Sequence, residues 1–356
     1  IFVSLVGGIA SIGDPTKMGR IGLKTFLLYL ATTALAIPIG LMMAVMLEPG
    51  TGMNLQLPEQ LASADKVAVT SSLVDLIPIN PFQAFASGST LQVIVFSILL
   101  GVAVAAVGEK AKPFNRVIES FAAIIYKLVE MIISLAPFGV FALIAVVTAR
   151  YGIDVLMPLG TLIFALYVGC IIHAAVVLGG LVRVIGKLSL LQFFRGIFEA
   201  QIVAFSTTSA AGTLPVTISC ARHNLGVSKE VAGFVLPVGA TVNMDGTGLY
   251  QALAAVFIAQ AYGITLSPME YMTILGTTIL ASIGTASVPA AGLIVLSMVL
   301  SSVGLPLEGI ALIAGIDRIL DMARTTVNVT GDAAVALLVA HSEGELNHDI
   351  FNNKAE

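Results

Sequence analysis

The sequence predicts an all-α protein that crosses a membrane several times. Of its 356 residues, 57% are hydrophobic and only 11% are charged, whereas soluble domains average about 25% charged residues. The mean hydropathy is +1.00, and apolar runs long enough to span a bilayer as helices recur along the chain. Backbone polar groups in lipid must be satisfied within their own segment, which favours helices. We therefore expect a polytopic helical membrane protein.

The composition also limits the partners and the chemistry. The net charge of −4 is small and no basic cluster is present, so we expect no nucleic-acid partner. Cys170 and Cys220 lie in or beside apolar segments, with neither a metal-ligand spacing nor a disulfide framework. We expect these cysteines and His173 to be packing residues. No Ser/His/Asp set converges, so we expect neither an enzyme nor a cofactor.

The first half of the chain alternates between apolar segments and polar loops. Residues 1–12 are interpreted as the end of a helix that begins before this sequence, and the polar run 13–20 as a turn. A full span is expected from Thr25 to Leu47. It is followed by a polar loop that contains Glu48, Glu59, Asp65, Lys66 and Asp75.

Three further apolar segments follow, and the second contains a proline that should kink it. The segments are 82–108, 117–149, which contains Pro137, and 158–185. Residues 342–356 are expected to form an unstructured tail. The expected solvated loops contain His223, His341 and His348.

The basic residues predict an orientation. If loop 13–24 is cytoplasmic, most other Lys and Arg residues of short loops also fall inside, as the positive-inside rule requires. These loops are 110–116, 183–195 and 222–229, whereas Lys66 and Arg150 fall outside. The number of crossings fits this assignment only if two segments enter the membrane and return on the same side.

Two later stretches are apolar but are interrupted by small polar residues. Stretch 197–217 has a Ser/Thr/Gly tip between two short apolar arms, and stretch 279–296 has the same design. Each suits a helical hairpin that enters the membrane halfway, because irregular backbone at that depth is tolerated where it lines a site. The same residue types also occur where helices pack closely in lipid, so the composition leaves both interpretations open.

Each interrupted stretch precedes a helix with polar residues. Asn243-Met-Asp245 follows the first stretch, and the run from Asn328 to Asp332 follows the second. An odd number of crossings separates the two copies, so they have opposite orientations. Secondary transporters place a site near the bilayer midplane between such inverted repeats.

The run from Gly315 to Asp332 predicts an apolar helix with one ionisable face. At about 100° per residue, five polar side chains share that face: Asp317, Asp321, Arg324, Asn328 and Asp332. Ionisable side chains are costly inside a membrane, so we interpret this face as a binding surface. For Asp317 and its neighbour Arg318, at the edge of the face, we expect an ion pair with each other or one that stabilises a hairpin tip.

Four motifs together indicate a family. They are Ser206–Gly212 followed by Thr213-Leu-Pro, Asn243-Met-Asp-Gly-Thr247, Ser282-Ile-Gly-Thr-Ala-Ser-Val-Pro289 and Asp321-Met-Ala-Arg-Thr-Thr-Val-Asn-Val-Thr-Gly-Asp332. The chain resembles the dicarboxylate/amino acid:cation symporters, the glutamate transporter family, over essentially its whole length. The resemblance implies eight spanning helices, two re-entrant hairpins and a homotrimer in the cell (plasma or inner) membrane. It also implies a transport domain that moves like an elevator against a static scaffold.

The same resemblance divides the chain into segments. Residues 1–12 would end helix 2 of the scaffold, 13–47 would be helix 3 of the transport domain, and 48–157 would contain helices 4 and 5 of the scaffold, with the trimer contacts. Residues 158–341 would contain helix 6, hairpin 1, helix 7, hairpin 2 and helix 8 of the transport domain. Residues 342–356 would be a cytoplasmic tail.

The resemblance assigns the substrate contacts. Arg324 would bind the side-chain carboxylate of aspartate or glutamate, which suits its planar guanidinium. Asp321 would bind the substrate ammonium and Asn328 the α-carboxylate. The other contacts would be Thr208, Ser209, Ala210, Thr247, Val288, Gly292 and Thr325. A purely structural ion pair of Arg324 with Asp321 or Asp317 remains an alternative.

The charge balance predicts coupling cations. Asp245, Asp321 and Asp332 outnumber Arg324, and an acidic substrate adds negative charge, so burial requires cations. By resemblance, these cations are Na⁺ in three sites of hard oxygen ligands. The first site comprises Gly239, Asn243, Asn328 and Asp332; the second comprises Thr241, Ser282, Ile283 and Thr285, with Met244 nearby; the third comprises Tyr29, Thr32, Thr33, Asn243 and Asp245.

We therefore expect a secondary active transporter that carries an acidic amino acid inward with Na⁺. Ala210 stands where many members have a serine, so aspartate, glutamate and cystine all remain possible substrates. Coupling to H⁺ instead of Na⁺, and an ion channel, in particular an anion channel, are the alternatives. The expected partners are the substrate, the lipid bilayer and further copies of the chain in a homotrimer.

Overall fold

The protein is helical throughout the part that the structure describes. This computed structural model describes residues 2–3, 6–7, 17–53, 55, 77–87, 90–133, 138, 141–142, 145, 149, 152, 156–283 and 291–352. Within these ranges, the single β-bridge joins Val227 and Leu346, and no strand is present. Two of the described helices, Gly19–Leu47 and Leu156–Ile185, are long and apolar enough to cross a membrane. The all-α prediction is confirmed for the described ranges.

Helices follow one another along the described chain with short connections in its second half. In chain order they are α2 (Lys17–Leu47), α4 (Pro81–Ser87), α5 (Thr90–Val107), η2 (Gly108–Ala111), α6 (Lys112–Ile133), α8 (Leu156–Ile172), the π-helical turns η4 (His173–Leu178) and η5 (Leu181–Ile185), α9 (Leu190–Thr207), α10 (Ala210–His223), α11 (Lys229–Val242), α12 (Asp245–Ala261), α13 (Pro268–Ile283), α14 (Ala291–Ser302), η6 (Leu307–Gly309), α15 (Ile310–Ala314), α16 (Asp317–Glu343) and α17 (His348–Asn352).

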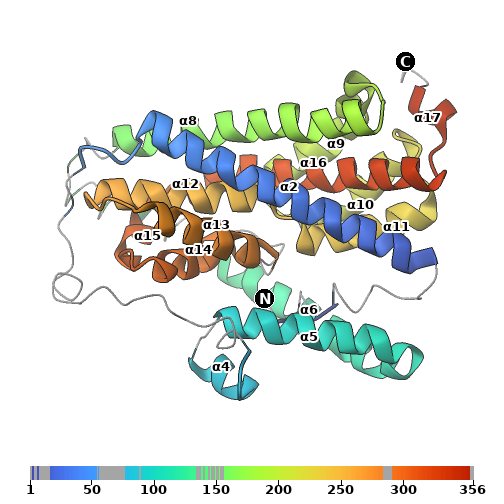
Figure 1. Cartoon of the computed structure of the whole chain (residues 1–356), viewed down its shortest axis with the longest axis horizontal. Coiled ribbons are helices and arrows are strands. Elements are labelled where there is room, and N and C mark those ends of the chain that lie inside the picture. The colour runs from blue at the N-terminus through green and yellow to red at the C-terminus, as the bar shows by residue number, and fades with distance from the viewer. Residues whose placement is uncertain are drawn as a thin grey trace.

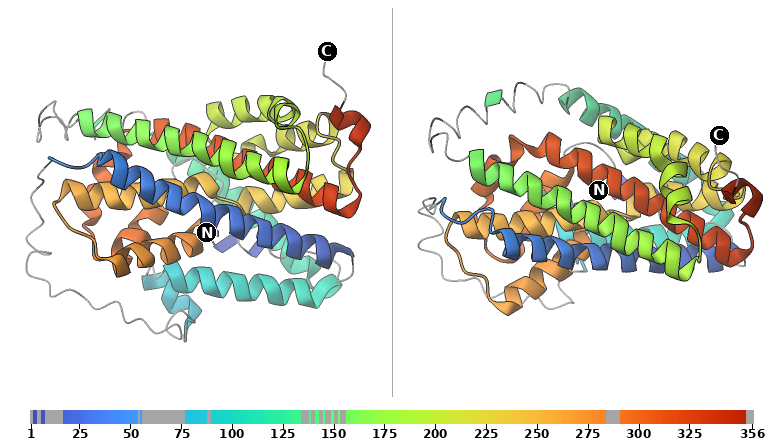
Figure 2. Two further views of the ribbon diagram at one scale, coloured as in Figure 1. Left: turned by 45° about the horizontal axis from the view of Figure 1, so that its top comes forward. Right: turned by 90° about the horizontal axis from the view of Figure 1, so that it is seen from above.

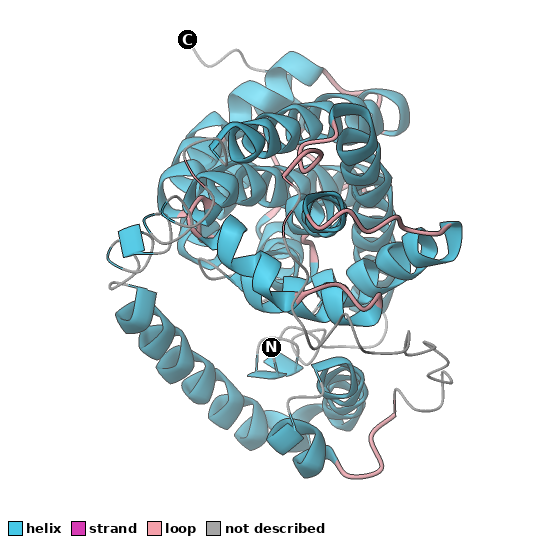
Figure 3. Cartoon of the chain, turned by 90° about the vertical axis from the view of Figure 1, so that its left-hand side faces the viewer, coloured by secondary structure: helices cyan, strands magenta, loops and turns pink. Residues whose placement is uncertain are grey.

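Four helices, α2, α8, α12 and α16, form the centre of a bundle (Figure 1), and each of them contacts the other three. They stay side by side when the molecule is turned about its long axis (Figure 2). α9, α10 and α11 pack against α16, while α13 and α14 pack against α12. α4, α5 and α6 lie beside this bundle, where α5 contacts α13. The view along the long axis shows the bundle helices nearly end-on (Figure 3).

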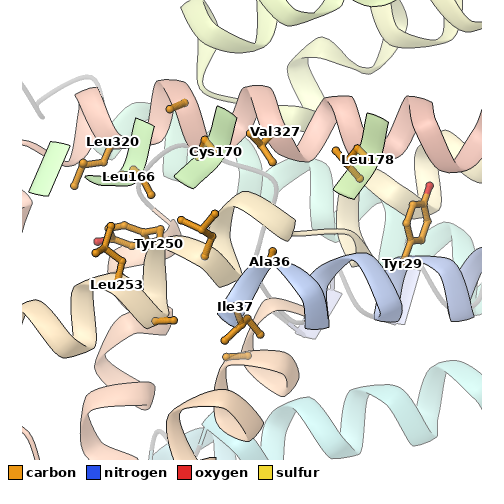
Figure 4. Packing of buried hydrophobic residues seen from close by; sticks show 14 of the residues in the cluster. Tyr29, Ala36, Ile37, Leu166, Cys170, Leu178, Tyr250, Leu253, Leu320 and Val327 are labelled. Carbon is orange, nitrogen blue, oxygen red and sulfur yellow. The ribbon is translucent and has the colours of Figure 1, made fainter. Parts of the chain in front are cut away.

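Helix α12 is the core of the bundle. All of its residues except Gln260 are buried, as expected for a helix that is surrounded by other helices. Its Tyr250 and Leu253 belong to one buried cluster with Leu166 of α8 and Ile37 of α2 (Figure 4). The polar residues at the start of α12 are therefore held inside the protein.

Glycines allow α2 and α12 to approach closely. A Cβ atom added at Gly40 of α2 would overlap the backbone carbonyl of Leu249, and one added at Gly50, just after α2, would overlap that of Phe257. Gly169 of α8 lies against the side chain of Leu249 from another side. Small residues permit such close helix contacts in membrane proteins.

Ion pairs join α2 to the end of α16. Arg20 Nη2 and Lys24 Nζ each lie 2.5 Å from the carboxylate of Glu343, whose side chain is 1% exposed. Lys24 Nζ also donates to Ser342 Oγ at 3.1 Å. The sequence predicted a turn over 13–20 and a span that starts at Thr25, but α2 already begins at Lys17. The contacts of Arg20 and Lys24 explain this earlier start.

The expected unstructured tail is wrong as far as Asn352. Gly344 ends α16 in the left-handed conformation (φ 70°), which glycine adopts without strain. The chain then returns, so that Asn347 N–H donates to the Gly226 carbonyl at 2.8 Å. Helix α17 follows and buries Phe351, which is 2% exposed. Apolar burial of one side chain and backbone pairing therefore fix this segment.

In the same region, His341 and His348 lie in helices and not in the solvated loops that the sequence predicted. His341 lies in the last turn of α16 and stacks edge-on against His348 of α17, with ring centroids 5.6 Å apart. Their predicted position in solvated loops is therefore wrong, because α17 folds back toward α16. His223 is the exposed last residue of α10.

Other expected boundaries also differ from those of the structure. Segment 82–108 forms two helices, α4 and α5, and segment 117–149 begins earlier, with α6 at Lys112. Segment 158–185 begins at Leu156 and continues through π-helical turns. The kink expected at Pro137 and the loop residues Glu59, Asp65, Lys66 and Asp75 lie outside the described residues.

Gly40→Ala is expected to destabilise the protein by about 1–3 kcal/mol, the usual cost of overpacking. The added Cβ would push α2 away from the Leu249 carbonyl. Gly19→Ala is the matched control in the same helix, because nothing lies within 4 Å of its added Cβ, and alanine favours the helix. Thermal unfolding of the purified protein in detergent measures both effects, and equal melting temperatures would contradict the close α2–α12 contact.

Candidate functional site

A helix break inside the bundle organises the polar side chains. α11 ends at Val242, Asn243 is extended (φ −91°, ψ 100°), and α12 begins at Asp245. The polar break that the sequence predicts is therefore present. Asn243 and Asp245 are both 0% exposed, so their polar atoms need partners within the protein.

Asn243 joins this break to α16. Its Nδ2 donates to Asp332 Oδ1 at 2.9 Å and to the backbone carbonyl of Asn328 at 3.3 Å. A Cβ added at Gly331 would overlap Asn243 Nδ2, and one at Gly239 would overlap Asp332 Oδ1. The four residues expected at the first cation site, Gly239, Asn243, Asn328 and Asp332, therefore converge.

Helix α2 supplies hydroxyl groups to the same cluster. Thr33 Oγ1 donates to Asp245 Oδ1 at 2.7 Å, and Thr32 Oγ1 lies 3.1 Å from the same oxygen and 3.4 Å from Asn243 Oδ1. The Tyr29 hydroxyl lies against Gly239 and donates to the Val235 carbonyl at 3.0 Å. The residues expected at the third cation site are thus also close together.

His173 belongs to this cluster, so its expected role as a packing residue is wrong. Its Nε2 lies 3.1 Å from Asp245 Oδ2, and both side chains are 0% exposed. It opens the π-helical turn η4, a backbone form that is frequent at functional sites. The signal that could have identified it is an ionisable side chain within an apolar helix. Cys170 and Cys220 are buried free thiols.

The cluster offers hard oxygen ligands. Carboxylates of Asp245 and Asp332 lie beside the Asn243 amide, the threonine hydroxyls and backbone carbonyls. In the described part of the chain, no three or more His, Cys, Asp and Glu side chains gather as a metal site. Oxygen donors suit hard cations such as Na⁺, whereas transition metals prefer nitrogen and sulfur.

Arg324 forms a second polar centre on α16. Its Nε and Nη2 lie 3.0 Å and 2.8 Å from Asp321 Oδ1, and its Nη1 lies 3.6 Å from Asp317 Oδ1. Its guanidinium carbon lies 4.6 Å from the centre of the Tyr250 ring, a cation–π contact. Thr325 Oγ1 donates to Asp321 Oδ1 at 3.0 Å. The ion pair that the sequence left open is present, and sequence reasoning missed Tyr250.

The guanidinium of Arg324 retains the N–H donors of Nη1 for a further acceptor. Within the described part of the chain, its Nη1 is buried and makes no hydrogen bond. Gly292, at the start of α14, lies so close that an added Cβ would overlap this nitrogen. A buried donor without an acceptor is costly, which makes Nη1 suitable for binding an anion.

Asn328 lies on α16 between the two polar centres. Its Oδ1 accepts from the Gly246 N–H at 2.8 Å, and its Nδ2 lies 3.3 Å from both Thr247 Oγ1 and Met244 Sδ. Arg324 lies one turn before it on α16, and Asp332 lies one turn after it. Two residues expected at different sites, Met244 and Thr247, therefore contact the same side chain.

The second expected cation site is only partly described. Thr241 Oγ1 donates to the Val238 carbonyl at 2.9 Å and Ser282 Oγ to the Thr278 carbonyl at 2.7 Å, both within their own helices. Ile283 is the last residue of α13. Thr285, together with the expected substrate contact Val288, lies outside the described residues.

α9 and α10 form a helical hairpin with Thr208 and Ser209 at its tip. Ser209 caps α10, since its Oγ accepts from the Gly212 N–H at 3.0 Å. Thr208 is left-handed (φ 53°, ψ 33°), which is an outlier for a β-branched residue and costs about 1–3 kcal/mol. The expected contact Ala210 is the first residue of α10 and is buried.

Asp317 and Arg318 point in different directions from α16. Asp317 is 4% exposed and lies beside Arg324, whereas Arg318 is exposed and donates from Nη1 to Thr208 Oγ1 at 2.5 Å. The expected mutual ion pair is therefore wrong. The alternative, an ion pair at a hairpin tip, is correct in its place and wrong in its partner: Arg318 contacts the tip, but through the Thr208 hydroxyl and the Ser206 carbonyl.

Buried ionisable side chains between apolar helices are typical of membrane transport proteins. The chain belongs to the Sodium:dicarboxylate symporter family, whose sequence profile matches residues 1–342. It is therefore a transporter and not an enzyme, and the family resemblance is confirmed.

Relatives with assigned names share most of their length with this chain. Proton/sodium-glutamate symport proteins of Geobacillus stearothermophilus and Bacillus caldotenax are each 38% identical to it, over 98% of this chain and 85% of the relative. The protein of that name from Bacillus subtilis (strain 168) is 35% identical, over 97% of this chain and 82% of the relative.

Thr33→Val is expected to destabilise the protein by about 1–3 kcal/mol, because the buried Asp245 carboxylate loses a donor at 2.7 Å. Thr161→Val is the matched control, since that hydroxyl bonds the Met157 carbonyl of its own helix and its loss should change stability by at most about 0.5 kcal/mol. Thermal unfolding in detergent compares the two variants. A similar loss in both would show that the Thr33–Asp245 bond contributes little.

Proposed function

We propose that the chain is a secondary active transporter that carries an acidic amino acid, aspartate or glutamate, together with Na⁺ across the cell membrane, which it spans several times. Membership of the symporter family supports this proposal, as do relatives that are named proton/sodium-glutamate symport proteins. The observation that carries it is the position of Asn328 on α16, one turn after Arg324 and one turn before Asp332, where its backbone carbonyl accepts from Asn243.

Asn328 supplies a physical reason for coupling. Its side chain contacts Thr247, and its backbone carbonyl accepts from Asn243 in the oxygen-rich cluster. A cation held by Asp332 and Asn243 would fix the orientation of Asn328, which then presents its amide to the substrate. Binding of one ligand would therefore favour binding of the other, the condition for symport.

The buried charges support a cationic partner. Among the described residues, four aspartates are buried but only one arginine, Arg324. The aspartates are Asp245, Asp317, Asp321 and Asp332. An acidic substrate adds further negative charge, which is prohibitively costly to bury without compensation. Na⁺ ions that travel with the substrate would neutralise this excess.

Each substrate group has a complementary partner. The side-chain carboxylate would bind the guanidinium of Arg324, including its buried Nη1. The ammonium group would bind Asp321, and the α-carboxylate would bind Asn328 and Thr247. The N-terminus of α10, after Ser209, would add backbone N–H donors, and helix N-termini favour anions.

We assign segments 13–47 and 158–341, which contain α2 and nearly all of the helices from α8 to α16, to a mobile transport domain. The mutual contacts of α2, α8, α12 and α16 support a single moving unit, as do the ion pairs of Glu343. Segment 48–157 would be the scaffold of a homotrimer. In its helix α6, an exposed apolar stripe recurs at alternating intervals of four and three residues, the pattern of paired helices: Val117, Phe121, Ile124, Leu128 and Met131.

The full-length protein in liposomes is expected to accumulate labelled aspartate or glutamate above the external concentration when an inward Na⁺ gradient is imposed. Accumulation should disappear when the Na⁺ gradient is removed and an H⁺ gradient is kept. Uptake that follows H⁺ alone would replace Na⁺ coupling with H⁺ coupling. Faster uptake of cystine than of aspartate or glutamate would make cystine the substrate. Uptake that never raises the internal concentration above the external one would indicate a channel.

Arg324→Ala is expected to weaken binding of acidic substrates by about 30-fold or more, because truncating one partner of a buried charge pair costs about 2–5 kcal/mol. Isothermal titration of aspartate and glutamate measures the loss. Arg324→Lys keeps the charge but not the planar fork, so it should restore part of the affinity. Unchanged affinity in folded Arg324→Ala protein would mean that Arg324 has only a structural role.

A further inference from the structure

We propose that Arg318 is a positioning residue for the substrate site: it holds the tip of the α9–α10 hairpin in the strained turn that directs the N-terminus of α10. The inference rests on the proposed function, since it concerns substrate affinity. It assigns a role to a charged residue that neither substrate nor cation binding uses.

The contact crosses between two distant parts of the chain. Arg318 Nη1 donates to Thr208 Oγ1 at 2.5 Å, and Nη2 donates to the Ser206 carbonyl at 3.4 Å. Both acceptors belong to the last turn and tip of the hairpin. One guanidinium therefore binds the Thr208 side chain and the Ser206 carbonyl, which lie on either side of Thr207. The flexible ammonium of lysine reproduces this geometry poorly.

Thr208 is the strained point of the tip. Its left-handed backbone (φ 53°, ψ 33°) is rare for a β-branched residue, and such a conformation persists where surrounding contacts over-determine it. Its side chain is 1% exposed, although Ser206 and Thr207 before it are exposed. Within the hairpin, Thr208 Oγ1 lies 2.7 Å from the Thr207 carbonyl. Arg318 adds the contact from outside the hairpin.

The strained turn sets the direction of α10. Ser209 immediately follows Thr208 and caps α10 through the Gly212 N–H at 3.0 Å. If Thr208 relaxed toward an extended or right-handed conformation, the first N–H groups of α10 would turn away from the site. Arg318 therefore acts on substrate affinity through the tip and without touching the substrate.

The position of Arg318 also links the tip to Arg324. The neighbouring Asp317 lies 3.6 Å from Arg324 Nη1 on the inner side of α16. The first turn of α16 thus holds the hairpin tip on its outer side and an acidic partner of the substrate-binding arginine on its inner side. A shift of this turn would therefore change the Arg318–Thr208 contact and the Asp317–Arg324 distance together.

The test is a double-mutant cycle in the full-length protein reconstituted in liposomes. Arg318→Ala is expected to raise the KM for aspartate or glutamate about tenfold, with a smaller change in Vmax, because one charge-assisted hydrogen-bonded contact is lost. Thr208→Gly removes the strain, since glycine adopts the left-handed conformation freely. In that background, Arg318→Ala should change KM less than about twofold, and this non-additivity indicates action through Thr208.

Two variants serve as controls. Arg195→Ala removes an exposed arginine from α9 of the same hairpin and should leave KM unchanged. Arg318→Lys should recover part of the affinity, and it replaces Arg318→Ala in the cycle if the alanine variant does not fold. An unchanged KM in Arg318→Ala overturns the proposal. A rise in KM that is equally large in the wild-type and the Thr208→Gly backgrounds also overturns it.

A second measurement is independent of transport. Because the native thiols Cys170 and Cys220 are buried, a cysteine introduced by Ala211→Cys reports accessibility at the tip. Its modification rate in detergent should rise several-fold when Arg318→Ala is added and not when Arg195→Ala is added. If the wild-type protein accumulates no acidic amino acid, the proposed function fails, while this rate still tests the tip contact. An unchanged rate shows that Arg318 does not hold the tip.

Discussion

The break between α11 and α12 leaves buried polar groups that the surrounding helices must pair through hydrogen bonds. At Asn243 and Met244 the chain leaves helical geometry deep in the core, where water cannot replace the interrupted hydrogen bonds. Helix α16 supplies two of these partners. Asn328 accepts from the Gly246 N–H, and Asp332 accepts from Asn243. α2 contributes threonine hydroxyls to Asp245 from the other side. The same groups that stabilise the break are the oxygen ligands of the proposed cation sites.

Much of this site was predictable because its residues share local patterns. The ionisable face of α16 follows from helical periodicity, and all five of its predicted residues are buried. The polar break at Asn243 follows from polar residues in an apolar run. By contrast, His173 looks like a packing residue in sequence, since its partner Asp245 is 72 residues away. Only the packing of α8, which η4 continues, beside α12 brings the two side chains together.

Side-chain direction was the other limit of prediction. Asp317 and Arg318 are neighbours of opposite charge, which in sequence favours a mutual pair. On a helix they are separated by about 100°, and the buried guanidinium of Arg324 attracts one while the hairpin tip binds the other. The tail was mispredicted for a similar reason. Its polar composition hides the single residue, Phe351, that anchors α17.

The contacts of α2 also bear on the order in which the protein is made. Thr33 and its partner Asp245 are 212 residues apart, and Lys24 and Glu343 are 319 residues apart. At about 5–20 residues per second, Asp245 is synthesised about 10–40 s after Thr33. In the proposed transporter, α2 would remain in the bilayer without its partners during that interval, which its apolar composition permits. The two described helices that are long and apolar enough to cross a membrane, Gly19–Leu47 and Leu156–Ile185, both precede α12 and α16. The apolar helices α2 and α8 are thus synthesised before α12 and α16, whose buried polar side chains need partners from other helices.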